Sequence, residues 1–156
     1  MASTVVSVAN AVLAIVRGLD LGIEFTAERT YGDYDDEASG REAVLIDVLT
    51  PQEPAVDLDS RGGLSYTFDV QIVVRKRILG TDRESQTGRL PNDQIDPLID
   101  AVERIADAMI PDVFAAVDAS WLEVPSVSLF DPQQLRQMGQ FIGQVTIRFE
   151  ARKALA

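Results

Sequence analysis

The chain has 156 residues, a formal net charge of −11, and neither cysteine nor histidine. These absences exclude disulfides, thiolate metal sites, cysteine nucleophiles and every catalytic arrangement that needs an imidazole. A hydrophobic fraction of 46% with 25% charged residues is typical of a folded globular protein, and the length predicts a single domain over residues 1–156.

The first part of the chain predicts a helix followed by strands. Apolar residues recur at helical spacing over Val5–Leu19, which indicates a helix with a wide buried stripe. Alternation over Ile23–Tyr31 predicts a strand with one buried face, and Ala43–Leu49 predicts a second strand. The acidic segment Gly32–Gly40 and the segment Gln52–Gly63 are predicted to be loops.

The second part predicts two long strands and a second helix. Leu64–Leu79 alternates as a long strand, and Asp93–Ile110 carries an apolar stripe at helical spacing. The segment Trp121–Phe130, interrupted by Pro125, predicts an edge strand. A turn and a short helical piece beginning at Asp131 then lead into the terminal strand.

Each long strand has one apolar and one polar face. The apolar residues of the terminal strand that face one way are Phe141, Val145, Ile147 and Phe149. This pattern predicts an α+β fold: a single domain with an antiparallel or mixed sheet and two main helices packed on one face. The polar side chains then become candidates for a channel wall or a subunit interface: Asp69, Gln71, Gln144, Thr146 and Glu150.

Carboxylates are numerous, but their spacing does not indicate catalysis. The loop residues Asp33, Asp35, Asp36 and Glu37 lack the ligand spacing of a calcium loop, which favours a solvated or DNA-repelling loop. They are therefore further candidates for a channel wall or a subunit interface. Asp69 and Lys76 are an odd number of residues apart and fall on opposite faces of a regular strand. No phosphate-binding motif occurs. We therefore expect no enzyme, no catalytic, cofactor-binding or metal-binding residues and no cofactor.

Charge and arginine content bear on possible partners. The chain has 25 acidic against 14 basic residues. Its net charge is therefore negative, whereas a free-standing nucleic-acid binder is normally positive, because neutralising phosphates requires basic residues. The acidity suits either simple solubility or a surface that stays near DNA without adhering to it. Arginine outnumbers lysine, which indicates either Arg–carboxylate contacts between subunits or GC-rich codon usage.

The ending of the chain supports a resemblance to a known family. Phe130-Asp131-Pro132 is followed by Gly139-Gln140-Phe141 and then by the strand Ile147–Arg152. Together with the size, the element order, the long strand and the second helix, these residues resemble the tail-terminator (tail-completion, neck) proteins of long-tailed bacteriophages. In that family an aspartate-led turn and a Gln-Phe step commonly introduce the last strand. The resemblance covers most of the chain but includes no active-site motif.

The resemblance implies a structural virion protein. It implies a homo-oligomeric ring, usually a hexamer, that caps the tail tube protein, stops its polymerisation and joins the tube to the head–tail connector or stopper protein. DNA passes through the lumen without specific binding. The resemblance also implies assembly in the host cytoplasm and a final location in the neck of the virion. From the sequence we expect neither a secretory signal nor a membrane span.

Three alternatives stay open. The first is another neck component, such as a head-completion or stopper protein. These proteins are similar in size to tail terminators and also form rings, although they typically contain more strands and fewer helices. A carboxylate-only metal-dependent enzyme would bind divalent cations. A cytosolic assembly chaperone would remain monomeric with the tube protein.

Overall fold

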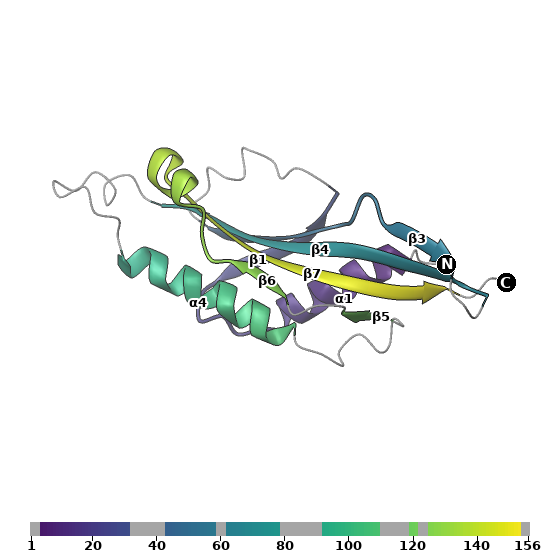
Figure 1. The fold of residues 1–156 in the computed structure, drawn as a ribbon. Coiled ribbons are helices and arrows are strands. Elements are labelled where there is room, and N and C mark those ends of the chain that lie inside the picture. The colour runs from purple at the N-terminus through teal and green to yellow at the C-terminus, as the bar shows by residue number, and fades with distance from the viewer. Residues whose placement is uncertain are drawn as a thin grey trace.

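Two helices and seven strands make up most of the part of the chain that the structure describes. The computed structural model describes residues 4–31, 43–58, 62–78, 92–109, 119–121 and 125–153. In chain order the elements are α1 (Thr4–Arg17), β1 (Phe25–Thr30), β2 (Val44–Leu49), β3 (Ala55–Leu58), β4 (Leu64–Arg77), α4 (Asn92–Ala108), β5 (Ala119–Trp121), β6 (Ser126–Ser128), η2 (Gln134–Met138) and β7 (Gln140–Lys153). Figure 1 shows α1 and α4 on the same side of one sheet. The predicted α+β fold, with its two main helices on one face of the sheet, is confirmed.

The sheet is mixed and is built around β4 and β7. Its order is β1-β2-β4-β7-β5, while β3 adds to the edge of β4 and β6 to the edge of β7. Strands β1 and β2 are parallel, and the other pairs are antiparallel. The two central strands pair along their full length, from Leu64↔Lys153 to Arg77↔Gln140. This long two-stranded ribbon forms the centre of the sheet.

The flanking strands are short and interrupted. Strand β3 pairs with β4 from Ala55↔Thr67 to Leu58↔Leu64, so the prediction of a loop over Gln52–Gly63 is wrong for these residues. All four residues of β3 are exposed, and they therefore lack the alternating burial that identifies a strand in sequence. On the other edge, the prediction of one strand over Trp121–Phe130 is wrong in its bounds, because β5 ends at Trp121 and β6 covers only Ser126–Ser128. Pro125, directly before β6, has no backbone N–H to donate to a strand partner.

The helices cover the apolar face of the sheet and form the core with it. The apolar residues predicted for the terminal strand, among them Phe141 and Phe149, are fully buried. Helix α1 packs mainly on β1 and β2, and α4 packs on β7. Gly143 allows the close approach of α4, because a Cβ at this position would lie 2.6 Å from Val102 Cγ2. Neither described helix has the length and apolarity needed to cross a bilayer.

The aspartate-led turn before β7 is held by its own hydrogen bonds. Asp131 Oδ1 accepts hydrogen bonds from the backbone N–H groups of Gln133 and Gln134, at 3.0 and 3.2 Å, as a helix-capping carboxylate does. The short helix ends at Gly139, whose φ of 64° is in the left-handed region that glycine tolerates best. The carbonyl of Gly139 then accepts a 2.8 Å bond from the N–H of Ile78. The predicted turn and short helical piece are thus confirmed, and they lock the start of β7 to the end of β4.

Candidate assembly surfaces

The sheet face opposite the helices carries the polar residues that the sequence singled out. We call this side of β4 and β7 the polar face. The register pairs Gln71 with Thr146, Asp69 with Arg148 and Thr67 with Glu150, and directly paired residues share a face. The candidates Asp69, Gln71, Gln144, Thr146 and Glu150 therefore lie together on one continuous surface, and the side chains of all five are partly exposed.

The charges on the polar face are paired within the subunit. Arg148 Nε lies 3.0 Å from Asp69 Oδ1, and Arg152 Nε lies 3.6 Å from Glu150 Oε1. Ser65 donates a further hydrogen bond of 3.3 Å to Glu150. The choice of polar candidates overlooked these arginines, which alternate with the candidates on the same strand. The described part of the polar face is consequently close to neutral.

A buried ion pair lies further along the polar face, towards β2. Arg75 Nε donates a 2.7 Å hydrogen bond to Asp47 Oδ2, with side chains only 6% and 8% exposed. Val73, which pairs with Asp47 and lies two residues before Arg75 on β4, is also buried. Such a pair fixes the relative position of β2 and β4, because separating the two groups would break a buried, charge-assisted hydrogen bond.

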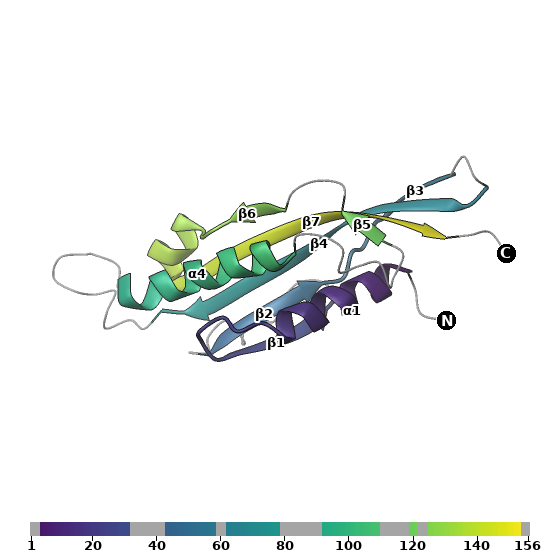
Figure 2. The same cartoon turned by 90° about the horizontal axis from the view of Figure 1, so that it is seen from below.

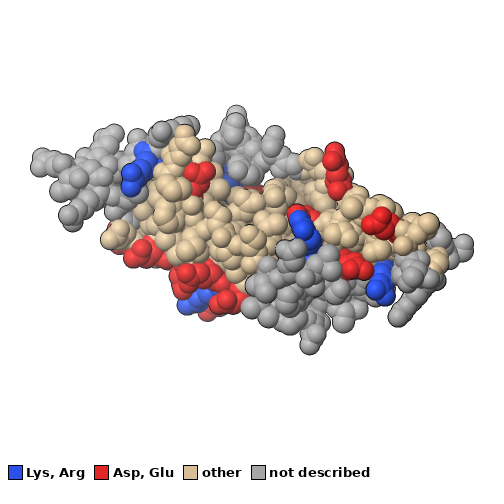
Figure 3. Space-filling view, in the orientation of Figure 1, with Lys and Arg blue, Asp and Glu red and all other residues tan. Residues whose placement is uncertain are grey.

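The acidic loop candidates Asp33, Asp35, Asp36 and Glu37 lie outside the described residues. Among the described residues, carboxylates also gather on α4, over its exposed side (Figure 3). We call this surface the acidic strip; its residues are Asp96, Asp100, Glu103 and Asp107, and all are exposed. Figure 3 shows carboxylates gathered over this part of the molecule. Arg104, 2.9 Å from Asp100, offsets one of the four charges.

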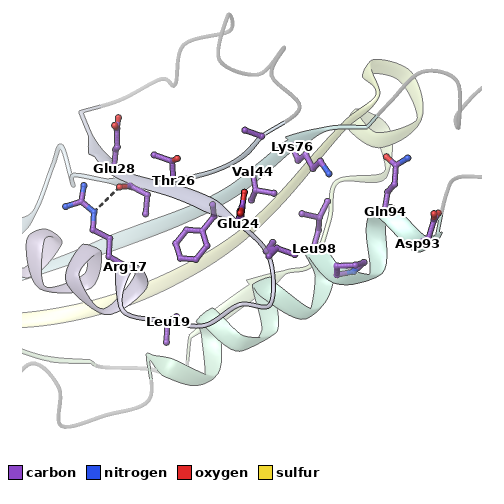
Figure 4. Close-up of a pocket in the computed structure, with 15 residues that line it drawn as sticks. Arg17, Leu19, Glu24, Thr26, Glu28, Val44, Lys76, Asp93, Gln94 and Leu98 are labelled. Atoms are coloured by element: carbon purple, nitrogen blue, oxygen red, sulfur yellow. Dashed lines mark hydrogen bonds between the residues drawn. The ribbon is translucent and has the colours of Figure 1, made fainter.

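An open groove lies on the helix side, between the start of α4 and the segment that follows α1. It encloses about 1090 Å³. Phe25, Val44 and Lys76 line it from the sheet, and Leu19, Ile23, Pro97 and Leu98 are among the residues that line it from its sides. The half-buried Lys76 makes no ion pair with any residue that the structure describes. Exposed charges of both signs, Arg17, Glu24, Glu28 and Asp93, also line it (Figure 4).

The described residues do not assemble a recognisable catalytic centre. They contain no group of three or more Asp and Glu side chains placed to hold a metal ion. Asp69 lies on the polar face, whereas Lys76 pairs with the buried Phe141 on the helix side, so the predicted separation of these two residues is confirmed.

Sequence reasoning found some of these surfaces and missed others. Alternation in β4 and β7 was sufficient to group the five polar candidates. The groove was missed because its lining comes from segments far apart in the chain, and no local pattern signals it. The carboxylates of α4 recur at helical spacing in the sequence, and the structure shows that they are exposed together on one side of the helix (Figure 3).

A search against models of protein families finds no match to this chain, and a search of curated proteins finds none either.

Proposed function

We propose that the protein is a structural component of a bacteriophage neck. In this proposal, copies of the chain form a closed ring on the end of the tail tube, stop its polymerisation and join it to the head connector. DNA passes through the lumen. The resemblance in the sequence is the origin of the proposal, and a ring of six copies is the stoichiometry that it implies.

The observation that supports the proposal most is the arrangement of the central ribbon. Strands β4 and β7 are paired over their full length, with both main helices on one face. The polar face is covered by neither α1 nor α4 (Figure 2) and presents partly exposed amide, hydroxyl and internally paired charged groups. Such a surface is too polar for a core and suits contact with neighbouring subunits, where interfaces of moderate polarity are normal.

The acidic strip suits the wall of a DNA channel better than the polar face does. Phosphates are repelled by carboxylates within about 10 Å at moderate salt. The strip has four carboxylates and one arginine, whereas each exposed carboxylate named on the polar face has an arginine within 4 Å. We therefore place α4, rather than the centre of the sheet, towards the lumen.

A tube-length assay tests the proposal. The purified protein is added to polymerising tail tube protein encoded by the same genome, and tube lengths are measured by electron microscopy. We expect shorter tubes, each ending in an added ring, with lengths that fall as the ratio of this protein to tube protein rises. Unchanged tube lengths with no bound ring would contradict the proposal.

The same assay distinguishes a tail terminator from a stopper protein, the other neck component considered above. A stopper protein would bind a completed terminator ring but leave the growth of a naked tube unaffected. Binding to connector complexes without any effect on tube length would therefore favour that alternative over the terminator.

A further inference from the structure

Strand β1 is the outermost strand on one side of the described sheet, and a side chain is bound to its outer edge. In the strand order β1-β2-β4-β7-β5, β1 has a partner among the described strands only on its β2 side (Figure 2). An edge strand presents backbone N–H and C=O groups to which a strand of another chain can add. On this edge, Arg17 Nε donates a 3.0 Å hydrogen bond to the carbonyl oxygen of Ala27 (Figure 4).

The backbone pairing of β1 shows that this carbonyl points away from the sheet. The N–H of Thr50, directly after β2, donates a 2.8 Å bond to the carbonyl of Thr30, so the Thr30 carbonyl faces β2. Successive carbonyls along a strand point in opposite directions, and Ala27 lies three residues before Thr30. Because Ala27 is the third of the six residues of β1, an added strand cannot form a continuous ladder while Arg17 holds this oxygen.

The end of α1 places Arg17 beside this edge. Arg17 is the last residue of the helix, and the helix packs on β1. The backbone is fixed directly after it, where the N–H of Gly18 lies 3.2 and 3.1 Å from the carbonyl oxygens of Ala14 and Ile15. The Arg17 residue itself is exposed and does not belong to the core cluster. Core packing therefore does not account for the position of its guanidinium.

The β1 edge of a second copy offers a matching surface. When two β1 strands lie antiparallel with Ala27 opposite Ala27, the outward-facing backbone groups of the two copies oppose one another. On the helix side of the sheet, this register places Phe25 opposite Arg29. On the other side it places Thr26 opposite Glu28. Since no two like charges are directly opposite within these pairs, the edge is able to pair with itself once the Ala27 carbonyl is released.

We propose that Arg17 protects the β1 edge. By holding the Ala27 carbonyl, it prevents the β1 strand of a second copy from extending the sheet, and it restricts self-association to other surfaces of the molecule. Charged side chains commonly protect edge strands against such pairing. The inference does not rest on the proposed function, because it concerns a contact that the intact protein avoids, whatever the tube-length assay shows.

Cysteine cross-linking tests this role, because the chain contains no cysteine of its own. Thr26 and Glu28 are exposed, and in the self-paired register their Cα atoms would lie about 4.5 Å apart, within reach of a disulfide. Chains with Thr26→Cys and chains with Glu28→Cys are mixed under mild oxidation, either with Arg17 intact or with Arg17→Met in both. We expect at least about tenfold more mixed disulfide with Arg17→Met, because pairing raises the local thiol concentration.

Arg104→Met is the matched control. Arg104 Nη1 also donates to a backbone carbonyl, that of Asp20 at 3.2 Å, but Asp20 belongs to no described strand. The control removes the same charge and the same kind of hydrogen bond away from a strand edge, so its cross-linking should equal that with both arginines intact. Circular dichroism checks that each variant folds.

Three results overturn the inference. Equal mixed disulfide with Arg17 and with Arg17→Met, with or without a loss of thermal stability, would assign Arg17 a purely structural role. An equal increase with Arg104→Met would show an effect of net charge alone. An increase with Arg17→Met that Arg17→Ala does not reproduce would arise from the introduced apolar side chain.

Discussion

The packing of α4 on β7 predicts a strong effect of Gly143→Ala. An alanine Cβ at this position would lie 2.6 Å from Val102 Cγ2, 2.9 Å from the Leu129 carbonyl oxygen and 3.2 Å from Phe141 Cε1. Favourable carbon–carbon contacts are at about 3.5–4.0 Å, so the first contact is about 1 Å too short. The Val102 side chain has one strongly preferred rotamer in a helix, and the Leu129 oxygen belongs to the backbone. Relief therefore requires α4 to move away from β7.

The expected magnitude follows from these contacts. Overpacking costs about 1–3 kcal/mol, and the rigid neighbours place Gly143→Ala near the upper end. Replacing glycine recovers about 0.4–1 kcal/mol by restricting the unfolded chain. The net loss is about 2 kcal/mol, which lowers Tm by about 4–8 °C in a domain of this size.

Thermal and urea unfolding, followed by circular dichroism, measure this loss. Gly18→Ala is the matched control, because its Cβ would meet only the carbonyl oxygens of Ala14 and Ile15, at 3.5 and 3.6 Å. Adding Val102→Ala to Gly143→Ala removes the shortest contact, so the double variant should lose less stability than the sum of the single changes. A Gly143→Ala protein as stable as the control would refute the close packing of α4 on β7.

Three further predictions concern charge. Asp47→Leu removes the carboxylate that Arg75 Nε bonds at 2.7 Å and should cost about 3–5 kcal/mol of unfolding free energy, whereas adding Arg75→Met should restore most of it. Urea unfolding of both variants measures the two losses, and equal losses would contradict the reasoning. Asp69→Asn breaks an ion pair whose side chains are 40–47% exposed, so solvent screening should limit the loss to under about 1 kcal/mol at 0.15 M salt; a larger loss in the same assay would contradict this. Neutralising the acidic strip with Asn and Gln should increase retention of the assembled protein on immobilised duplex DNA at low salt and slow DNA ejection from particles, and unchanged retention and ejection would remove α4 from the lumen.

The central architecture could be predicted from the sequence because burial there is regular. Alternation in β4 and β7 identified both strands and their faces, and helical spacing identified α1 and α4. The aspartate-led turn was also readable, since Asp131 and Gly139 are residue types that favour the two ends of a short helix. In each of these elements a local pattern and the tertiary environment favour the same structure.

The remaining features depend on contacts between distant residues. Strand β3 forms because β4 offers a free edge at Leu64–Thr67, not because Ala55–Leu58 has a buried face of its own. Asp47 and Arg75 are 28 residues apart, and only the register of β2 against β4 brings them together. The pairing of Asp69 with Arg148 likewise depends on register across 79 residues. Sequence reasoning therefore found the polar face but not its charge balance.

The most direct test of the account is imaging of the purified protein, alone and with its tube protein, by mass photometry and negative-stain electron microscopy. The account predicts closed rings of one stoichiometry with a central opening, either in isolation or on tube ends. A single subunit under both conditions, at every concentration accessible to the two methods, would contradict it.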